Sequence, residues 1–490
     1  MAAPSTRLDR RRFLRGAAAT GAAAAAGVGV AAAAGCGSSS SDKRVDVVVA
    51  GAGMAGLYAA RMLAPRRSVV VLEASDRVGG RVLNLKTGPK PEDVTEAGAQ
   101  WISPKQQRIA RLMKEFGLKP FANYLAGKST LIVNGKVQHF DALPFPALSL
   151  AQVAEVGVAM ADLTAMAATV PVEAPWNAPK AAEWDGQTAE SWVRDNVSDP
   201  VAQSFLGFAT GGPVSVLPTD ISLLHYLYIA AALGGPLEMM IPGQGVLTSR
   251  IVGGTGRFVE GLARPLRSIT KLGSPVTTIE HGGDTVRVTT PDVSYVADHV
   301  VIAMAPTMTQ QILFDPVLPV HRTQSVQRVG MGSAIKCFPI YPTPFWRSRG
   351  LSGNVLSNSG VFSAVFDNSP PSGSPGVLFV LVENTHARRF STLSEGERKA
   401  EVLDALAPAF GDEVRNPSGY VEHDWSTEAW IRGGAASFFP PGVLTEYRYL
   451  FGDPIGRLHF ASTETGHAFW GNMEAALESG ERAAQEIHAA

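Results

Sequence analysis

The chain has 490 residues, of which 45% are hydrophobic and 18% are charged, and its formal net charge is −1. This length exceeds one compact core, so several domains are expected in an ordinary globular protein. A near-neutral chain offers no electrostatic basis for binding nucleic acid. Two cysteines, Cys36 and Cys337, allow no disulfide framework, and the 10 histidines lack metal-ligand spacing, so no metal is expected.

Residues 1–35 have the features of an export signal. Arg10, Arg11 and Arg12 precede Phe13-Leu14, and an alanine- and glycine-rich stretch follows over 16–34. Twin arginines at this place are typical of the Tat route, which carries folded proteins, so an extracytoplasmic location is expected. Loss of residues 1–35 removes five arginines and one aspartate and leaves a net charge of −5. The alternative is a membrane anchor, although alanine and glycine contribute little transfer energy.

The end of this segment also resembles a bacterial lipobox. Ala33-Ala34-Gly35-Cys36 would make Cys36 the lipid-bearing mature N-terminus, attached to the outer face of the membrane. Residues 36–43 would then be a Gly/Ser tether. Ala33 replaces the usual bulky residue, so lipidation and simple cleavage both stay open. Beyond this segment the sequence indicates neither a second apolar span nor a fixed-period repeat.

The first predicted elements of the folded part form a nucleotide-binding unit. A buried strand over 45–50 leads into a glycine-rich turn and a helix over 57–63. In such a turn the first glycine permits the bend, the second lets backbone approach a pyrophosphate, and the third allows close helix packing. The helix N-terminus offers free N–H groups to phosphate. The turn consists of Gly51, Ala52, Gly53, Met54, Ala55 and Gly56.

A second strand over 68–72 ends at Glu73, which lies 22 residues after Gly51. A carboxylate at this place accepts hydrogen bonds from both ribose hydroxyls and disfavours a 2′-phosphate. The spacing therefore predicts a dinucleotide site for FAD or NAD and disfavours NADP.

The residues after Glu73 separate FAD from NAD. The segment Glu73-Ala74-Ser75-Asp76-Arg77-Val78-Gly79-Gly80-Arg81 resembles the flavin-containing monoamine oxidase family, in which it runs along FAD. The segment from Glu96 to Trp101 is similar to the family's next flavin-contacting turn. The resemblance implies FAD as cofactor and identifies the chain as a bacterial exported member. It places these residues at the cofactor: Ala74, Arg77, Gly80, Arg81, Gly98, Ala99, Gln100 and Trp101.

Further matches lie in the middle and at the C-terminal end. By resemblance the backbone of Val276, in a strand over 275–279, meets adenine, and Glu464 of Thr463-Glu464-Thr465 accepts from the cofactor's sugar-alcohol chain. Asn472 and Met473 come before a final helix, whose N-terminus stabilises negative charge on the reduced flavin ring. Motifs near both ends of the chain would thus form one FAD site.

The resemblance covers residues 44–488 and implies an α/β fold. The expected architecture is a Rossmann-type FAD-binding domain, like that of monoamine oxidases, with an interleaved α+β substrate domain. The FAD-binding domain is expected from three separated pieces: 44–125, 246–330 and 446–490. The substrate domain is expected from two pieces: 126–245 and 331–445.

Lys336 stands inside an apolar run that reads as a strand. On the sequence alone its ammonium either points outward into solvent or serves a buried site. The family's lysine at this place hydrogen-bonds a water beside flavin N5, which favours the buried site. Cys337 is expected to be a small buried hydrophobe. Trp425 begins a segment, 424–442, that resembles the part of monoamine oxidases below the flavin.

Three departures from the family pattern matter. Ala435 replaces a cysteine that bonds covalently to flavin in mammalian-type members, so non-covalent FAD is expected. Ala436 and Asn472 stand where two tyrosines form a cage around the amine. A ring from elsewhere would then have to serve, and three candidates are available: Trp470, Phe438 and Trp430.

The implied activity is FAD-dependent amine oxidation. A hydride passes from the amine α-carbon to flavin N5, the imine is hydrolysed to an aldehyde or ketone, and dioxygen is reduced to hydrogen peroxide. Trp101 stands where amino-acid oxidases of this superfamily carry a carboxylate-clamping arginine, which argues against amino acids unless Arg432 substitutes. The alternatives are an L-amino-acid oxidase, a carotenoid-type desaturase, an amine dehydrogenase with another electron acceptor, or a non-catalytic FAD-binding protein. Neither the amine nor the oligomeric state follows from the sequence.

Overall fold

A computed structural model of the chain describes residues 42–141, 148–239, 242–448 and 452–490. The export signal, Cys36 and the tether up to residue 41 lie outside these described ranges. The predictions made for that segment therefore stay predictions. The folded part, from Asp42 to Ala490, is one compact unit in which elements distant in sequence pack together.

One sheet carries the predicted nucleotide-binding unit. Its strands are β1 (Lys43–Ala50), β2 (Val69–Leu72), β9 (Thr270–Lys271), β10 (Thr278–Glu280), β11 (Val286–Thr289), β12 (Ser294–Ile302), β13 (Leu313–Asp315) and β21 (Leu458–Phe460). They follow the order β13-β10-β11-β12-β1-β2-β9, and β21 also pairs with β12. β1 runs parallel to both β2 and β12, with Val48 opposite Val70 and Val300. The uninterrupted valine run of β1 suits a strand that is covered on both faces.

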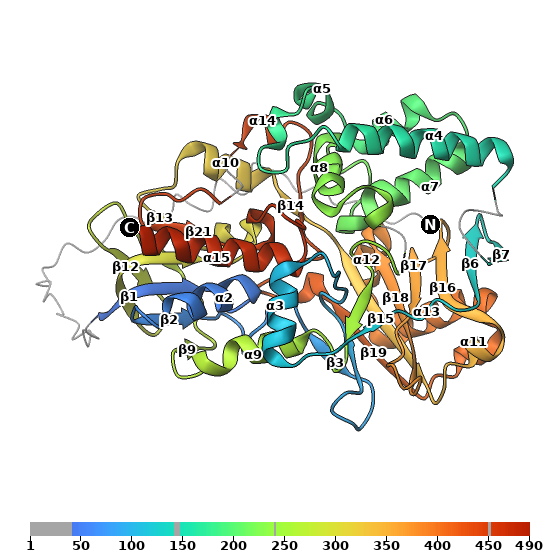
Figure 1. Ribbon diagram of the computed structural model, residues 1–490, viewed down its shortest axis with the longest axis horizontal. Coiled ribbons are helices and arrows are strands. Elements are labelled where there is room, and N and C mark those ends of the chain that lie inside the picture. Colours follow the sequence, from blue (N-terminus) through green and yellow to red (C-terminus); the bar gives the residue numbers. More distant parts are fainter. Residues whose placement is uncertain (1–41, 142–147, 240–241, 449–451) are drawn as a thin grey trace, which may run out of the picture. The chain divides into compact units, whose positions relative to one another are not determined.

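Helices from separated stretches of the chain lie around this sheet (Figure 1). They include α2 (Met54–Leu63), α3 (Gln107–Phe116), α9 (Gly256–Ala263), α10 (Val320–Arg328) and α15 (Met473–Ala489). α15 packs directly on α2, because a Cβ at Gly480 would lie 2.4 Å from the carbonyl oxygen of Ala55. A glycine there lets the C-terminal helix approach the first helix closely.

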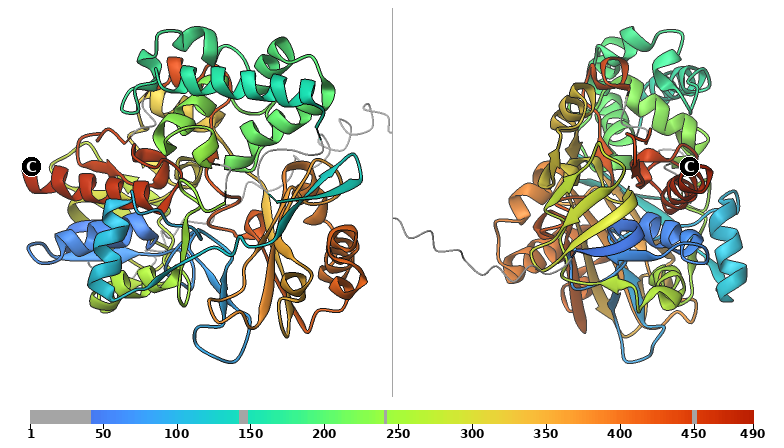
Figure 2. Two further views of the ribbon diagram at one scale, coloured as in Figure 1. Left: turned by 45° about the vertical axis from the view of Figure 1, so that its right-hand side comes forward. Right: turned by 90° about the vertical axis from the view of Figure 1, so that its left-hand side faces the viewer.

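A second sheet lies beside the first and is mostly antiparallel (Figure 2). Its strands are β6 (Lys128–Val133), β7 (Lys136–Phe140), β15 (Ala334–Tyr341), β16 (Leu351–Ser357), β17 (Ala364–Asp367), β18 (Gly376–Glu383) and β19 (Gly419–Asp424). They follow the order β19-β15-β18-β17-β16-β6-β7, and only β6 and β16 run parallel. The helices α11 (Phe345–Ser348), α12 (Asn384–Phe390) and α13 (Glu395–Phe410) accompany it.

Three short strand pairs complete the β-structure. They are β3 (Asn84–Lys86) with β4 (Val94–Glu96), β5 (Pro120–Ala122) with β8 (Ser249–Ile251), and β14 (Gly330–Met331) with β20 (Ser437–Phe438).

A helical part lies above the second sheet in Figure 1. Its helices are α4 (Leu150–Ala167), α5 (Ala181–Asp185), α6 (Ala189–Asn196), α7 (Pro200–Gly211), α8 (Leu223–Leu233) and α14 (Val443–Glu446). Ser149 and Gln152 form a capping box that begins α4. By length and composition alone α4 is apolar enough to cross a membrane, a property that the sequence reading missed. Val156, Met160 and Leu163 bury its inner face in the protein core.

Each sheet is assembled from separated stretches of the chain. β1 and β2, β9 to β13, and β21 enter the first sheet from three separated stretches, whereas β6, β7 and β15 to β19 form the second. The α/β fold is as predicted. One boundary differs: the strand expected over 275–279 begins at Thr278, so Val276 lies in the loop before it.

Candidate active site

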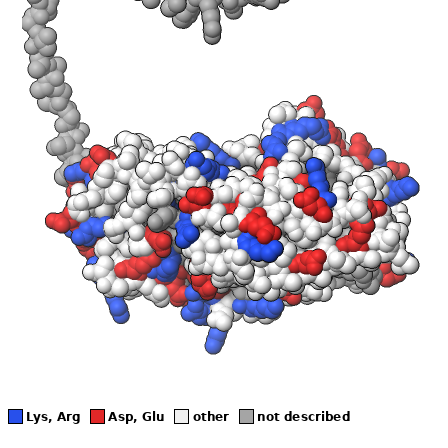
Figure 3. Space-filling model, turned by 90° about the horizontal axis from the view of Figure 1, so that it is seen from above, with Lys and Arg blue, Asp and Glu red and all other residues white. Residues whose placement is uncertain are grey.

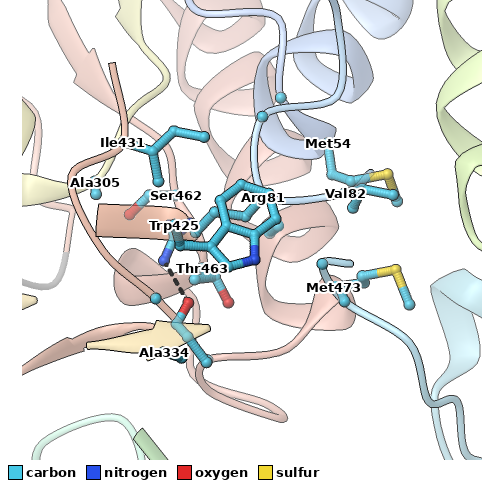
Figure 4. A pocket seen from close by; sticks show the side chains of 18 of the residues that line it. Met54, Arg81, Val82, Ala305, Ala334, Trp425, Ile431, Ser462, Thr463 and Met473 are labelled. Atoms are coloured by element: carbon cyan, nitrogen blue, oxygen red, sulfur yellow. Dashed lines mark hydrogen bonds between the residues drawn. The ribbon is translucent and has the colours of Figure 1, made fainter. Parts of the chain in front are cut away.

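A cavity of about 430 Å³ gathers residues from both sheets and both ends of the chain. Of the residues predicted for the site, eighteen line it: Gly51, Gly53, Met54, Ala55, Glu73, Ala74, Arg77, Gly80, Arg81, Gly98, Ala99, Gln100, Trp101, Val276, Lys336, Trp425, Asn472 and Met473. Figure 4 shows part of this lining, including Met54 and Arg81 from the N-terminal segment and Thr463 and Met473 from the C-terminal one. Three predicted residues, Gly56, Glu464 and Trp470, are not among the lining residues.

The glycine-rich turn has the geometry that a dinucleotide needs. Gly51 has φ +112°, and a Cβ there would lie 2.3 Å from the carbonyl oxygen of Ala303. A Cβ at Gly56 would lie 2.0 Å from the carbonyl oxygen of Gly51. Gly56 therefore allows the helix to pack closely on the turn, although it does not line the cavity. A Cβ at Gly53 would meet nothing within 4 Å. The turn is therefore closed on its protein side and open at Gly53, which fits a phosphate group of a cofactor.

Glu73 lies at the end of β2 and is 8% exposed. One carboxylate oxygen accepts from the backbone N–H of Ala52 at 2.6 Å. The other accepts from the backbone N–H and hydroxyl of Ser75 at 2.9 and 2.8 Å. These bonds fix the carboxylate beside the glycine-rich turn, at the end of the cavity that Val276 also lines. This arrangement fits the ribose contact expected from the sequence.

Arg81 joins the N-terminal and C-terminal motifs. Its guanidinium donates to both carboxylate oxygens of Glu464 at 2.7 and 2.8 Å, and to the carbonyl of Ala435 at 3.1 Å. Burial by itself would raise the pKa of Glu464, but Arg81 outweighs it and holds the pKa below its usual value. Ser437 also donates to this carboxylate. Glu464 therefore positions Arg81, and its predicted contact with the cofactor stays a prediction.

The other cavity arginine is also paired. Arg77 donates to Glu428 at 2.9 Å and to the carbonyl of Gly80 at 2.8 Å. Arg432, the candidate substitute for a carboxylate clamp, is not among the lining residues and donates to the carbonyl of Ala429. Within the described part of the cavity, each lining arginine thus already holds a carboxylate, which disfavours a substrate carboxylate there.

Lys336 points from β15 into the cavity, so the alternative of an outward-pointing side chain is wrong. Its ammonium donates to the carbonyls of Gly98 at 2.7 Å and Glu96 at 3.4 Å and lies 4.5 Å from the ring centre of Phe379. Burial lowers the pKa of Lys336 to about 7. The neighbouring Cys337 is fully buried on the opposite side of the strand, as expected, and burial raises the pKa of its thiol.

Trp425 follows β19 and is 3% exposed. Its indole N–H donates to the carbonyl of Ala97 at 2.8 Å, which fixes the orientation of the ring. Met473 is the first residue of α15, and Asn472 precedes it. The N-terminus of this 17-residue helix therefore opens at the cavity, and its partial positive charge favours an electron-rich group there.

The structure places Trp470, one of the three candidates for the missing ring, in the helical core and not in the cavity lining. Trp470 is 1% exposed, and its ring packs edge-on against His225, Tyr228 and Phe439 in the helical core. Its indole N–H donates to the carbonyl of Glu464 at 3.2 Å, so burial leaves no polar group unpaired. Of the three aromatic candidates, Trp430 alone is among the lining residues.

Several lining residues escaped the sequence reading. The turn after β12 contributes Ala303, Met304 and Ala305, and its position at the end of a buried strand is the signal that could have found it. From β17 and β18 come Phe366, Phe379, Leu381 and Glu383. The alternation within β18 indicates its two faces, but the sequence does not tell which face meets a cavity.

Charged side chains of both signs are mixed on the face of the described residues that Figure 3 shows. Lysine and arginine side chains lie close to aspartate and glutamate side chains over the face in Figure 3. Within the described residues, no group of three or more histidine, cysteine, aspartate or glutamate side chains could hold a metal ion.

Comparison with known proteins agrees with this geometry. The family model for flavin containing amine oxidoreductases matches residues 54–488. A Mycobacterium tuberculosis protein named as a flavin-containing monoamine oxidase, AofH, is 34% identical over 446 residues, 91% of this chain and 97% of that protein. Flavin-containing amine oxidase A of Equus caballus is 32% identical over 447 residues, 90% of this chain and 84% of that protein.

Two solved structures are similar over nearly their whole length. Wild-type putrescine oxidase bound to putrescine has a TM-score of 0.87 and 30% identity, covering 92% of this chain and 100% of that one. Cyclohexylamine oxidase from Brevibacterium oxydans IH-35A has a TM-score of 0.86 and 30% identity, covering 91% and 99%. The chain therefore belongs to the flavin-containing amine oxidase family, and it is an oxidoreductase that uses a flavin to act on small amines.

Proposed function

We propose that this enzyme oxidises amines with a non-covalently held FAD and works outside the cytoplasm. The observation that carries the activity is one cavity lined by the glycine-rich turn, by Glu73, by Lys336 and by the start of α15. When bound, FAD supplies the redox chemistry by accepting a hydride from the amine α-carbon and passing the electrons to dioxygen as hydrogen peroxide. The resulting imine is hydrolysed by water to an aldehyde or ketone.

The residues of the chain bind, orient and exclude water. Gly53 and the start of α2 suit the pyrophosphate, and Glu73 suits the adenosine ribose. Trp101, Phe366 and Phe379 form an aromatic wall, with ring centres 5.1 Å apart for Trp101 and Phe366. Burial in the cavity penalises a charged ammonium, so the reacting nitrogen binds as the neutral amine.

Lys336 and α15 provide the electrostatics. The ammonium of Lys336 is held by two carbonyl oxygens. Its lowered pKa of about 7 lets the side chain release or take up a proton near neutral pH. By resemblance it orders a water beside flavin N5. The N-terminus of α15 favours the negative charge that develops when the cofactor is reduced.

The experiment that tests the activity is an anaerobic screen of the purified flavoprotein. Aliphatic and aromatic amines are added, and bleaching of the flavin absorbance is followed. Amine oxidation predicts rapid bleaching by at least one amine and stoichiometric hydrogen peroxide after oxygen is admitted. The absence of bleaching by every amine would favour a purely structural flavin.

The electron acceptor is tested in the same preparation. For an oxidase, reoxidation of the amine-reduced protein by dioxygen should be fast enough to support turnover. Much faster reoxidation by a quinone or a cytochrome would instead identify a dehydrogenase.

Non-covalent binding is supported by Ala435, which lines the cavity at the place of the family's flavin-bonding cysteine and has no nucleophilic side chain. Precipitation of the protein with acid should therefore release all of the flavin into the supernatant. Yellow colour retained in the washed precipitate would contradict this proposal.

Export is supported by Arg10, Arg11 and the alanine-rich stretch that follows them. Conversion of both arginines to lysine should stop export, whereas the activity of the cytoplasmic precursor should persist. Cys36→Ser separates the two forms of maturation. Loss of membrane attachment in this variant would indicate lipidation, and unchanged release would indicate simple cleavage.

A further inference from the structure

Glu383 is a cavity residue that the chemistry described above does not use. It is the last residue of β18 and pairs with Ala334 of β15. Two residues earlier, Leu381 pairs with Lys336. Side chains two apart on a strand share a face, and these four side chains accordingly line the same cavity. The carboxylate of Glu383 thus belongs to the wall that carries Lys336.

The partners of this carboxylate are neutral. Glu383 is 3% exposed. One oxygen accepts from the hydroxyl of Ser215 at 2.6 Å, and the other accepts from the hydroxyl of Ser363. Burial raises the pKa of Glu383 to about 7, and the two hydroxyls and Lys336 only partly offset that rise. A buried carboxylate in this state gains strongly from a full positive charge beside it.

The other carboxylates in the described cavity lining already accept hydrogen bonds from backbone N–H groups or from an arginine. Glu73 is bound by backbone N–H groups, and Glu428 is bound by Arg77. Glu383 differs because it accepts from hydroxyls alone and has no basic side chain within hydrogen-bonding distance.

Lys336 is the nearest candidate for a counterion, but it is committed elsewhere. Its ammonium donates to the carbonyls of Gly98 and Glu96, and burial lowers its pKa to about 7. At neutral pH it is therefore charged only part of the time. Glu383 lines the cavity, so its carboxylate faces a ligand that binds there.

We propose that Glu383 binds a second, positively charged amino group of the substrate, so that aliphatic diamines or polyamines are preferred over monoamines. This inference rests on the proposed amine oxidation and specifies its substrate class. Glu383 lies two residues, roughly 7 Å, along β18 from Leu381, the residue that pairs with Lys336, and a short aliphatic chain is long enough to span that offset. The reacting nitrogen binds uncharged, and the distal ammonium pairs with the carboxylate.

Paired amines of equal length test the proposal in the purified flavoprotein. Butylamine is compared with 1,4-diaminobutane, and pentylamine with 1,5-diaminopentane, by anaerobic stopped-flow reduction of the flavin. A charged hydrogen bond predicts that the wild type binds each diamine about 10-fold or more tightly than the matching monoamine. The limiting rate of reduction should differ much less, because the contact lies away from the reacting carbon.

Glu383→Gln keeps the shape and removes the charge. It should abolish the diamine preference and leave the constants for monoamines within about 3-fold of the wild type. Glu383→Asp keeps the charge and should retain a preference. Glu422→Gln is the matched control, because Glu422 lies in the same sheet beside Arg398 and is not a lining residue. It should change neither series.

The outcomes separate the two proposals. Equal binding of monoamines and diamines by the wild type overturns the inference without any variant, while amine oxidation stands. A Glu383→Gln protein that weakens both series equally identifies a structural role through Ser215 and Ser363, and also overturns it. If no amine reduces the flavin, the proposed function itself fails.

Discussion

Arg81 donates two parallel hydrogen bonds to Glu464, a residue 383 positions later in the chain. Glu464 is fully buried, whereas the side chain of Arg81 is 22% exposed and lines the cavity. The pair therefore fastens the segment after β2 to the segment after β21. It also orients a guanidinium at the cavity, where geometry of this fork type is specific.

Loss of this pair should destabilise the protein strongly. Arg81→Ala leaves the Glu464 carboxylate buried without its partner, which predicts a loss of about 3–5 kcal/mol in the free energy of unfolding. Arg61→Ala is the control, because it breaks a more exposed pair with Glu115 and should cost less than about 1 kcal/mol. Denaturant unfolding measures both. Equal losses in the free energy of unfolding would show that the buried pair stabilises the protein no more than the exposed pair does.

The same pair has a pH signature. Arg81 lowers the folded-state pKa of Glu464, so its stabilisation is complete above the unfolded pKa and is lost as pH falls through the folded one. The stability difference between wild type and Arg81→Ala should therefore shrink on acidification. A difference that is constant from pH 7 to pH 3 would contradict this linkage.

Two glycines of the nucleotide turn should respond differently to alanine. At Gly53 a methyl group meets no protein atom, so Gly53→Ala should fold with nearly wild-type stability without FAD and yet bind FAD much more weakly. At Gly51 the methyl group would clash with Ala303, and the positive φ adds strain, so Gly51→Ala should also lower the melting temperature of the FAD-free protein. Thermal unfolding and FAD titration measure the two effects. Wild-type FAD affinity in Gly53→Ala would contradict the placement of the cofactor.

The lowered pKa of Lys336 makes the stability of the folded protein depend on pH between about 7 and 10.5. Its folded pKa of about 7 lies below the ordinary value of 10.5, so between these values the unfolded chain binds the extra proton. Wild-type stability should consequently rise with pH across that range relative to Lys336→Met. At pH 7 the variant should be the more stable protein, and by pH 10 its advantage should be largely gone. Melting temperatures test this, with the exposed Lys114→Met as control, for which no such trend is expected.

Free amino acids should be poor substrates. Both lining arginines hold carboxylates of the protein, and Trp101 stands at the place of the expected clamp. A substrate carboxylate would enter the cavity without a partner, which predicts at least about a 100-fold lower kcat/KM for phenylalanine than for phenylethylamine. Hydrogen peroxide release with the two compounds measures the ratio. Comparable rates would show that another group binds the carboxylate.

The sequence alone indicated the elements whose signal is local. The valine run of β1, the glycines at 51, 53 and 56 and the carboxylate at Glu73 are tied to one strand–turn–helix unit. Their backbone requirements act within a few residues, so the pattern determines them. The resemblance to flavin amine oxidases added the C-terminal motif and Lys336, and the cavity includes Lys336, Asn472 and Met473 from that set.

Only the tertiary structure decided which side chains face the cavity and which partner each one has. Trp470 and Trp430 are both aromatic residues near a motif, yet one packs in the core and the other lines the cavity. Glu464 pairs with Arg81, and Glu383 meets hydroxyls, because strands far apart in sequence bring those groups together. Long-range packing sets the burial and the charge state of each group. The pattern of residues along the sequence does not specify which of these groups meet.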